Sequence, residues 1–146
     1  MTGASEAIPT GTLMAGKRGL VMGVANNRSI AWGIARACHA QGAEIALTYQ
    51  GEALKKRVGP LAAEIGTRLV LPCDVTDNAS MDEVFATLSK EWGGLDFVVH
   101  ALAYSDPREL VGRYVDTTRD NFANTMLISC FSFTEVAKRA AALMTN

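Results

Sequence analysis

The chain has 146 residues, which is enough for one compact domain with its own hydrophobic core. Its composition, 49% hydrophobic and 20% charged with a net charge of -1, is ordinary for a globular domain and does not favour nucleic acid or an anionic membrane as a partner. No stretch approaches the roughly 18 apolar residues of a membrane span, so we expect no membrane association.

Residues 1–13 mix threonine, glycine, serine, proline and alanine, without the basic start and apolar run of a signal peptide. The regular hydrophobic pattern begins near Met14. We therefore predict a flexible N-terminal tail over residues 1–13, followed by a single domain over residues 14–146.

Three elements open the ordered part of the chain. Residues 20–24 are a short apolar run stopped by glycine and asparagine, which predicts a buried strand. Residues 30–41 predict a helix whose small residues at i, i+4 and i+7 pack closely on a sheet, and Gly42 ends it. Residues 44–48 predict the second strand.

The next elements repeat this alternation. Apolar spacing over residues 54–65 predicts an amphipathic helix, in which Gly59-Pro60 predicts a kink or a division into two short helices. Residues 68–72 predict the third strand. Ser80-x-x-Glu83 then fits a capping box at the start of the clearest helix in the chain.

A fourth strand, a loop and a long helix complete the pattern. Residues 95–100 predict the strand and residues 101–118 the loop. One stripe runs along the helix that follows, and its members are Phe122, Met126, Ser129, Phe133, Val136 and Ala140. Strand and helix thus alternate four times, which predicts an α/β domain with a doubly wound parallel sheet, a Rossmann fold. Such a sheet binds ligands beyond the carboxyl ends of its strands.

The first strand-to-helix turn is rich in small residues. Its flanking glycines, Gly23 and Gly33, are too far apart for a standard G-x-G-x-x-G motif. Small residues still let the backbone approach a pyrophosphate, and the free N–H groups of the following helix face it. The hydroxyl of Ser29 adds a donor. A simple capping turn, with Asn27 or Ser29 as the N-cap, is the alternative.

This turn, Gly-Val-Ala-x-x-x-Ser-Ile-Ala-x-Gly, resembles the cofactor turn of bacterial enoyl-acyl-carrier-protein reductases of the NADH type, which belong to the short-chain dehydrogenase/reductase superfamily. The resemblance continues through residues 46–50, 73–75 and 100–104, and it runs from about Met14 to the last residue. Four matching segments in the same order are more specific than any one of them. The resemblance implies that the chain forms the first four β-α units, the N-terminal part, of a longer dinucleotide-binding domain.

The resemblance assigns cofactor contacts to seven residues. They are Gly23, Ser29 and Ile30 in the first turn, Gln50 at the adenosine ribose, Asp74 and Val75 at the adenine ring, and Leu102 on the nicotinamide side. Gln50 stands where an Asp or Glu is common, and no arginine for a 2′-phosphate sits beside it, although Lys55, Lys56 and Arg57 are near in sequence. We therefore favour NADH over NADPH. The alternatives are that Gln50 is a loop residue and that Asp74 caps the next helix.

The fourth strand ends in His100-Ala-Leu-Ala-Tyr104-Ser105, where most short-chain dehydrogenases have Asn-Ala-Gly. The resemblance places Tyr104 and Ser105 at the border of the acyl pocket. Ala103 stands where many family members have glycine, so its methyl group would tighten the nicotinamide pocket. We interpret His100, on an apolar strand, as a hydrogen-bonded structural residue, and His39 as a surface residue.

The resemblance implies that the family's catalytic tyrosine and lysine lie beyond the fourth helix, so we assign no catalytic residue in this chain. The resemblance implies NADH-dependent reduction of the trans-2 double bond of enoyl substrates linked to acyl carrier protein, in fatty acid biosynthesis. A ketoacyl reductase, another short-chain dehydrogenase, and a dinucleotide-binding fragment without turnover are the alternatives.

Two expectations concern the surroundings of the chain. Cys38, Cys73 and Cys130 form no Cys-x-x-Cys or Cys/His cluster, which predicts buried free thiols in a reducing compartment, the cytoplasm, and no metal site. In the superfamily the fourth helix joins a subunit interface, so the resemblance implies a homo-oligomer, a tetramer, with Phe131 and Phe133 at the contact. Packing within the chain explains the same stripe equally well.

Overall fold

The computed structural model describes residues 7–145, and its centre is a four-stranded parallel sheet in the order β3-β2-β1-β4. β1 (Arg18–Met22) lies between β2 (Glu44–Tyr49) and β4 (Phe97–His100), and β3 (Val70–Pro72) pairs with the far side of β2. The predicted strands are therefore confirmed, with ends displaced by up to two residues.

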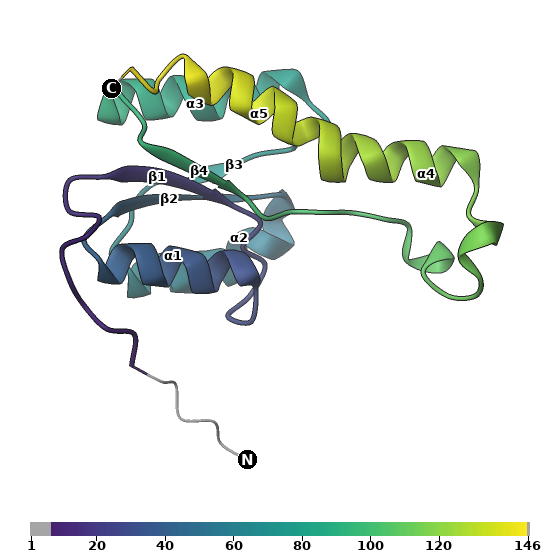
Figure 1. Cartoon of the computed structure of the whole chain (residues 1–146), viewed down its shortest axis with the longest axis horizontal. Coiled ribbons are helices and arrows are strands. Elements are labelled where there is room, and N and C mark those ends of the chain that lie inside the picture. Colours follow the sequence, from purple (N-terminus) through teal and green to yellow (C-terminus); the bar gives the residue numbers. More distant parts are fainter. Residues whose placement is uncertain (1–6, 146) are drawn as a thin grey trace.

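Helices cover both faces of the sheet. α1 (Ile30–Ala40) and α2 (Gly51–Glu64) lie on one face, and α3 (Asn78–Trp92) and α5 (Ser132–Ala141) lie on the other (Figure 1). This arrangement confirms the predicted doubly wound α/β fold.

The strands supply both halves of the core because successive side chains point to opposite faces. Val21 and Leu47 pack in the cluster that includes α1 and α2, whereas Leu20 and Met22 pack in the cluster that includes α3 and α5. All four side chains are buried. A strand that is apolar on both faces belongs in the middle of a covered parallel sheet, which explains the continuous apolar run of β1.

Beyond β4 the chain leaves these layers. Two 3-10 turns, η1 (Pro107–Glu109) and η2 (Tyr114–Asp116), interrupt the loop, and α4 (Arg119–Met126) returns the chain through a π-helical segment, η3 (Leu127–Phe131), into α5. Figure 1 shows this segment reaching out beyond the sheet. We call residues 101–131 the arm and the remaining described residues the body.

Two helix predictions were wrong. α2 is one helix that includes Pro60 and is not divided into two short helices, because this proline is exposed while Val58 and Leu61 anchor the opposite side of the helix in the core. The alternative, a kink at Gly59-Pro60, stays a prediction. The capping box at Ser80 does not form. Asp77 is the N-cap of α3 and accepts a hydrogen bond from the Ala79 N–H, while the Ser80 hydroxyl accepts one from the Asp74 N–H at 2.9 Å.

The last helical run has two different surroundings. Val136 and Ala140, at its C-terminal end, are buried against the body, as packing within the chain requires. Phe122 and Phe133 of the same predicted stripe are about half exposed, at 49% and 53%. The interpretation of the stripe as core therefore holds only for its last two members.

The N-terminal tail and the cysteines complete the comparison with the sequence. Residues 1–6 of the predicted tail lie outside the described residues, and the tail stays a prediction, although the Gly11 N–H donates to the Ala40 carbonyl at 2.9 Å. Within residues 7–145 the cysteines are free. Cys73 is buried as predicted, Cys38 is only half-buried, and Cys130 is exposed, so the prediction of burial is wrong for Cys130. No helix in that range is long and apolar enough to cross a membrane.

Candidate functional site

A cleft of about 670 Å³ opens at the carboxyl ends of the strands. The chain runs from β1 to β2 on one side and later returns as β4 on the other, so the order of the strands reverses beside β1, and parallel α/β sheets bind ligands at such a reversal. Six of the predicted site residues line the cleft: Gly23, Gln50, Asp74, Val75, Leu102 and Tyr104. Its volume is within the range of roughly 300–1,000 Å³ typical of small-molecule and cofactor sites.

Gly23 lets two strand ends meet at the cleft. Its φ is 105°, which lies in the region that favours glycine, and a Cβ atom built there would be 2.0 Å from the Ala101 carbonyl oxygen. Only glycine therefore allows the turn after β1 to pass this close to the segment after β4.

Ser29 organises the turn before α1 without capping the helix by its side chain. It occupies the N-cap position, but its hydroxyl oxygen accepts hydrogen bonds from the N–H groups of Ala25 at 2.9 Å and Asn26 at 3.0 Å. The side-chain cap proposed as the alternative does not form. Ser29 and the exposed Ile30 are not among the residues that line the cleft; they form the N-terminus of α1 beside it, where the first helical N–H groups have no intrahelical acceptor.

Asp74 and Gln50, from different strand ends, are in contact. Gln50 Nε2 donates to Asp74 Oδ2 at 3.2 Å, and the Thr76 hydroxyl and N–H donate to Asp74 Oδ1 at 2.7 and 2.9 Å. The bonds from Thr76, together with the weaker one from Gln50, lower the pKa of the Asp74 carboxyl below its usual value. Asp74 is therefore a carboxylate at neutral pH and does not cap α3, since Asp77 has that place.

The other side of the cleft comes from the arm. Leu102, Ala103 and Tyr104 line it in succession. Ser105 does not: its oxygen accepts hydrogen bonds from Asn121 Nδ2 at 3.2 Å and from the Thr125 hydroxyl at 3.0 Å, so its side chain is engaged by α4.

His100 has the structural place predicted for it. Its Nε2 lies 2.7 Å from the Ser132 hydroxyl oxygen, and that hydroxyl donates to the Ile128 carbonyl at 2.6 Å. Because serine has one hydroxyl hydrogen, His100 Nε2 is the donor and carries the ring proton. Burial lowers the pKa of His100, so the ring is neutral at pH 7. His39 is exposed, as predicted.

Sequence reasoning missed the residues that line the cleft from the helical part of the arm. Asn124 of α4 and Ile128 of η3 line it from the arm. Neither belongs to the apolar stripe read from the sequence, and nothing local indicates that α4 lies against the segment after β4.

Comparison with known proteins agrees with this geometry. Residues 23–146 match the family model described as enoyl-(acyl carrier protein) reductase. The chain belongs to this family. The resemblance expected from the four sequence segments is thereby confirmed.

Individual enoyl-acyl-carrier-protein reductases match most of the chain. The NADH enzyme 2 of Rhizobium meliloti (strain 1021) is 66% identical over 134 residues, which are 92% of this chain and 50% of that protein. The crystal structure of the enzyme from Anaplasma phagocytophilum in complex with NAD has a TM-score of 0.91 at 58% identity, covering 96% of this chain and 54% of that one. A Bacillus cereus reductase structure with NADP+ and indole naphthyridinone has a TM-score of 0.87 at 46% identity, covering 91% and 52%. The chain spans about half the length of the enoyl-acyl-carrier-protein reductases it matches.

Proposed function

We propose that this chain is the cofactor-binding half of an enoyl-acyl-carrier-protein reductase that reduces the trans-2 double bond of acyl thioesters in fatty acid biosynthesis. The observation that supports this most directly is the cleft, which gathers Gln50, Asp74 and Leu102 from three strand ends in a chain whose relatives are named as NADH-dependent enzymes of this kind.

The donor and acceptor groups of the cleft fit a dinucleotide. The N-terminus of α1, with the Ser29 hydroxyl, suits an anionic pyrophosphate. The Asp74 carboxylate would accept from the exocyclic amine of adenine, Val75 would flank the ring, and Gln50 would bond the ribose. When bound, the cofactor supplies the hydride, and the residues of this chain hold and orient it.

The environment of Gln50 favours NADH over NADPH. A 2′-phosphate requires a cation beside the ribose. The Lys55 ammonium instead lies 3.3 Å from a Glu52 carboxylate oxygen and 5.9 Å from the centre of the Tyr49 ring. Gln50 itself donates to Asp74, so the position for a 2′-phosphate is occupied by a neutral amide next to a carboxylate, which would repel it.

Residues of the arm support the part of the proposal that concerns the substrate. Tyr104 borders the space where the acyl thioester would enter. The next residue, Ser105, is held to α4 by the hydrogen bond that its side chain accepts from the Thr125 hydroxyl. The resemblance implies a catalytic tyrosine and lysine outside this chain, and acyl carrier protein as the carrier of the substrate. Exposed apolar side chains on the last helical run, Phe122, Met126, Leu127, Phe131 and Phe133, support a homo-oligomer, which we propose to be a tetramer in the cytoplasm.

The deciding experiment follows NADH absorbance when the full-length protein receives either a trans-2-enoyl thioester or a 3-keto thioester. We expect oxidation of NADH with the enoyl thioester alone. Oxidation with the keto thioester alone would make the protein a ketoacyl reductase. NADH binding without turnover of either substrate would make it a binding module.

A further inference from the structure

We propose that Ser129 and Ser132 are positioning residues that clamp the segment 100–104 at both ends and thereby set the shape of the substrate side of the cleft. The inference rests on the proposed function. It assigns a role to two residues that the cofactor contacts do not use.

The Ser129 hydroxyl binds both peptide groups of one residue. It accepts a hydrogen bond from the Tyr104 N–H at 3.1 Å and donates one to the Tyr104 carbonyl at 3.2 Å. A single hydroxyl that satisfies the donor and the acceptor of the same residue restricts that residue more than either bond alone. Tyr104, which lines the cleft, is thus held at its backbone.

Ser132 holds the other end of the segment. His100 Nε2 donates to its hydroxyl oxygen, and the hydroxyl donates to the Ile128 carbonyl, so the Ser132 side chain links β4 to the helical run. Ser132 is fully buried, and the Phe133 ring lies edge-on to His100 at 5.7 Å between centroids. Residues 101–103, which lie between these two hydrogen-bonded ends, have apolar side chains that form no hydrogen bonds.

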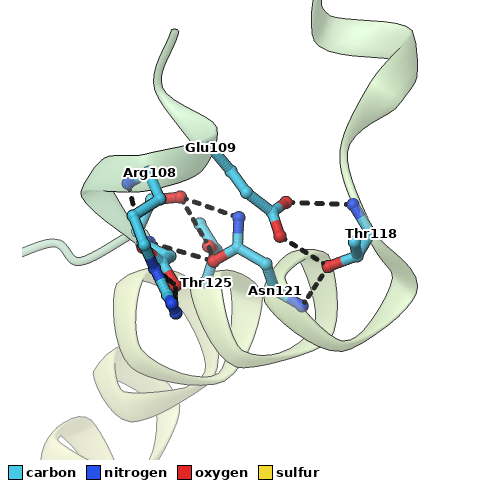
Figure 2. A network of polar contacts seen from close by, with 7 residues as sticks. Arg108, Glu109, Thr118, Asn121 and Thr125 are labelled. Carbon is cyan, nitrogen blue, oxygen red and sulfur yellow. Dashed lines mark hydrogen bonds and ion pairs between the residues drawn. The ribbon is translucent and has the colours of Figure 1, made fainter.

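The same row continues along α4. Asn121 Oδ1 accepts from the Asp106 N–H at 2.9 Å, and the Thr125 hydroxyl donates to Ser105 at 3.0 Å. Figure 2 shows this network, with Asn121 and Thr125 on one side of the helix. Asn121, Thr125 and Ser129 are four residues apart, so they share one face and bind residues 106, 105 and 104 in turn.

Ser129 lies within a π-helical segment, and Ser132 is the first residue of the α-helix that follows. The π-helical segment η3 spans Leu127–Phe131, and such segments are rare and concentrate at functional sites. Here Ile128 within it lines the cleft, while its carbonyl receives the Ser132 hydroxyl. The helix and the segment 100–104 therefore form one wall, and Ser129 sits at the end of that wall nearest the proposed acyl site.

The test uses the full-length enzyme and the variant Ser129→Ala. We expect the KM for a trans-2-enoyl thioester to rise roughly threefold to tenfold, the range for loss of one net hydrogen bond. The Kd for NADH, read by fluorescence titration, should change less than the KM, because Ser129 binds Tyr104 directly, whereas Gln50 and Asp74 lie on other strand ends. Ser129→Thr keeps the hydroxyl and should return KM toward the wild-type value. Ser89→Ala, an exposed position on α3, is the matched control and should change neither constant.

A second measurement needs no variant. Amide hydrogen exchange of the wild-type enzyme should be slower at Tyr104 than at Ala103. Fast exchange at Tyr104, or a Ser129→Ala variant with a lower Tm but unchanged KM and Kd, would overturn the clamp. Failure of the proposed function is recognised separately, because the wild-type enzyme itself would then not oxidise NADH with the enoyl thioester.

Discussion

The body and the arm are stabilised by different interactions. In the body, Leu20 and Leu47 are fully buried, and apolar side chains from both faces of the sheet fill two clusters. In the arm, Leu110 is 71% exposed and hydrogen bonds such as those from Thr118 to Glu109 hold the loop (Figure 2). Because a hydrogen bond contributes only modestly to the net free energy of unfolding, we expect the body to be more stable than the arm. The cleft lies at their boundary.

The largest expected difference comes from matched leucines. Leu47→Ala in the sheet should lower the free energy of unfolding by about 2–5 kcal/mol, since it removes buried methyl groups and leaves a cavity. Leu110→Ala in the arm should change it by less than about 0.5 kcal/mol. Urea denaturation measures both. Equal losses would mean that the arm has a core of its own.

Two glycines give a second, slightly smaller contrast. Gly23→Ala should cost about 3 kcal/mol, because the new methyl group meets the Ala101 carbonyl as well as an unfavourable φ of 105°. Gly112, in the arm, has a φ of 95° but nothing within 4 Å of a built Cβ. Gly112→Ala should therefore cost about 1 kcal/mol in the same denaturation experiment. If both variants lose the same free energy of unfolding, the loss comes from the backbone conformation alone, and the close approach at Gly23 contributes nothing to it.

Asp74 tests the assignment of the cofactor to the body side of the cleft. Asp74→Ala should weaken NADH binding roughly tenfold, as expected for a lost hydrogen bond to a charged group, with little change in KM for the enoyl thioester. Asp120→Ala, at an exposed position in the arm, is the control. Unchanged NADH affinity by calorimetry for Asp74→Ala would remove this residue from the site.

The smallest effect concerns pH and the contact between His100 of β4 and Ser132 of α5. Burial lowers the pKa of His100 from its ordinary 6.5, so the folded state binds fewer protons than the unfolded state below that pH. The contribution of this histidine to the free energy of unfolding is fully present above pH 6.5. It declines as the pH falls below 6.5 toward the lowered pKa of the folded state. Thermal melting of His100→Gln between pH 7.5 and 5 should show a flatter pH dependence than the wild type; parallel curves would contradict this account.

Local pattern was sufficient for most elements and insufficient for their ends. Buried strands and amphipathic helices have distinct spacings of apolar residues, so β1 and α3 could be recognised. The start of α3 could not, because Asp77 and Ser80 both suit an N-cap and only the path of the chain after β3 decides between them. The predicted division of the helix at Pro60 failed for a similar reason, because the effect of a proline on a helix depends on whether it faces solvent or the core.

By itself, the sequence determined the α/β alternation, because strands and helices have distinct short-range spacings of apolar residues. Its resemblance to a known family indicated the family and the strand-end residues Gln50, Asp74 and Leu102, which line the cleft. Only the tertiary structure decided that Gln50 and Asp74 touch and that α4 forms a wall of the cleft with Asn124 and Ile128. It also decided that Ser129 faces Tyr104. These contacts join residues far apart in the chain, and the direction of a helix after a long loop is set by packing and hydrogen bonding across that distance, which no local pattern encodes.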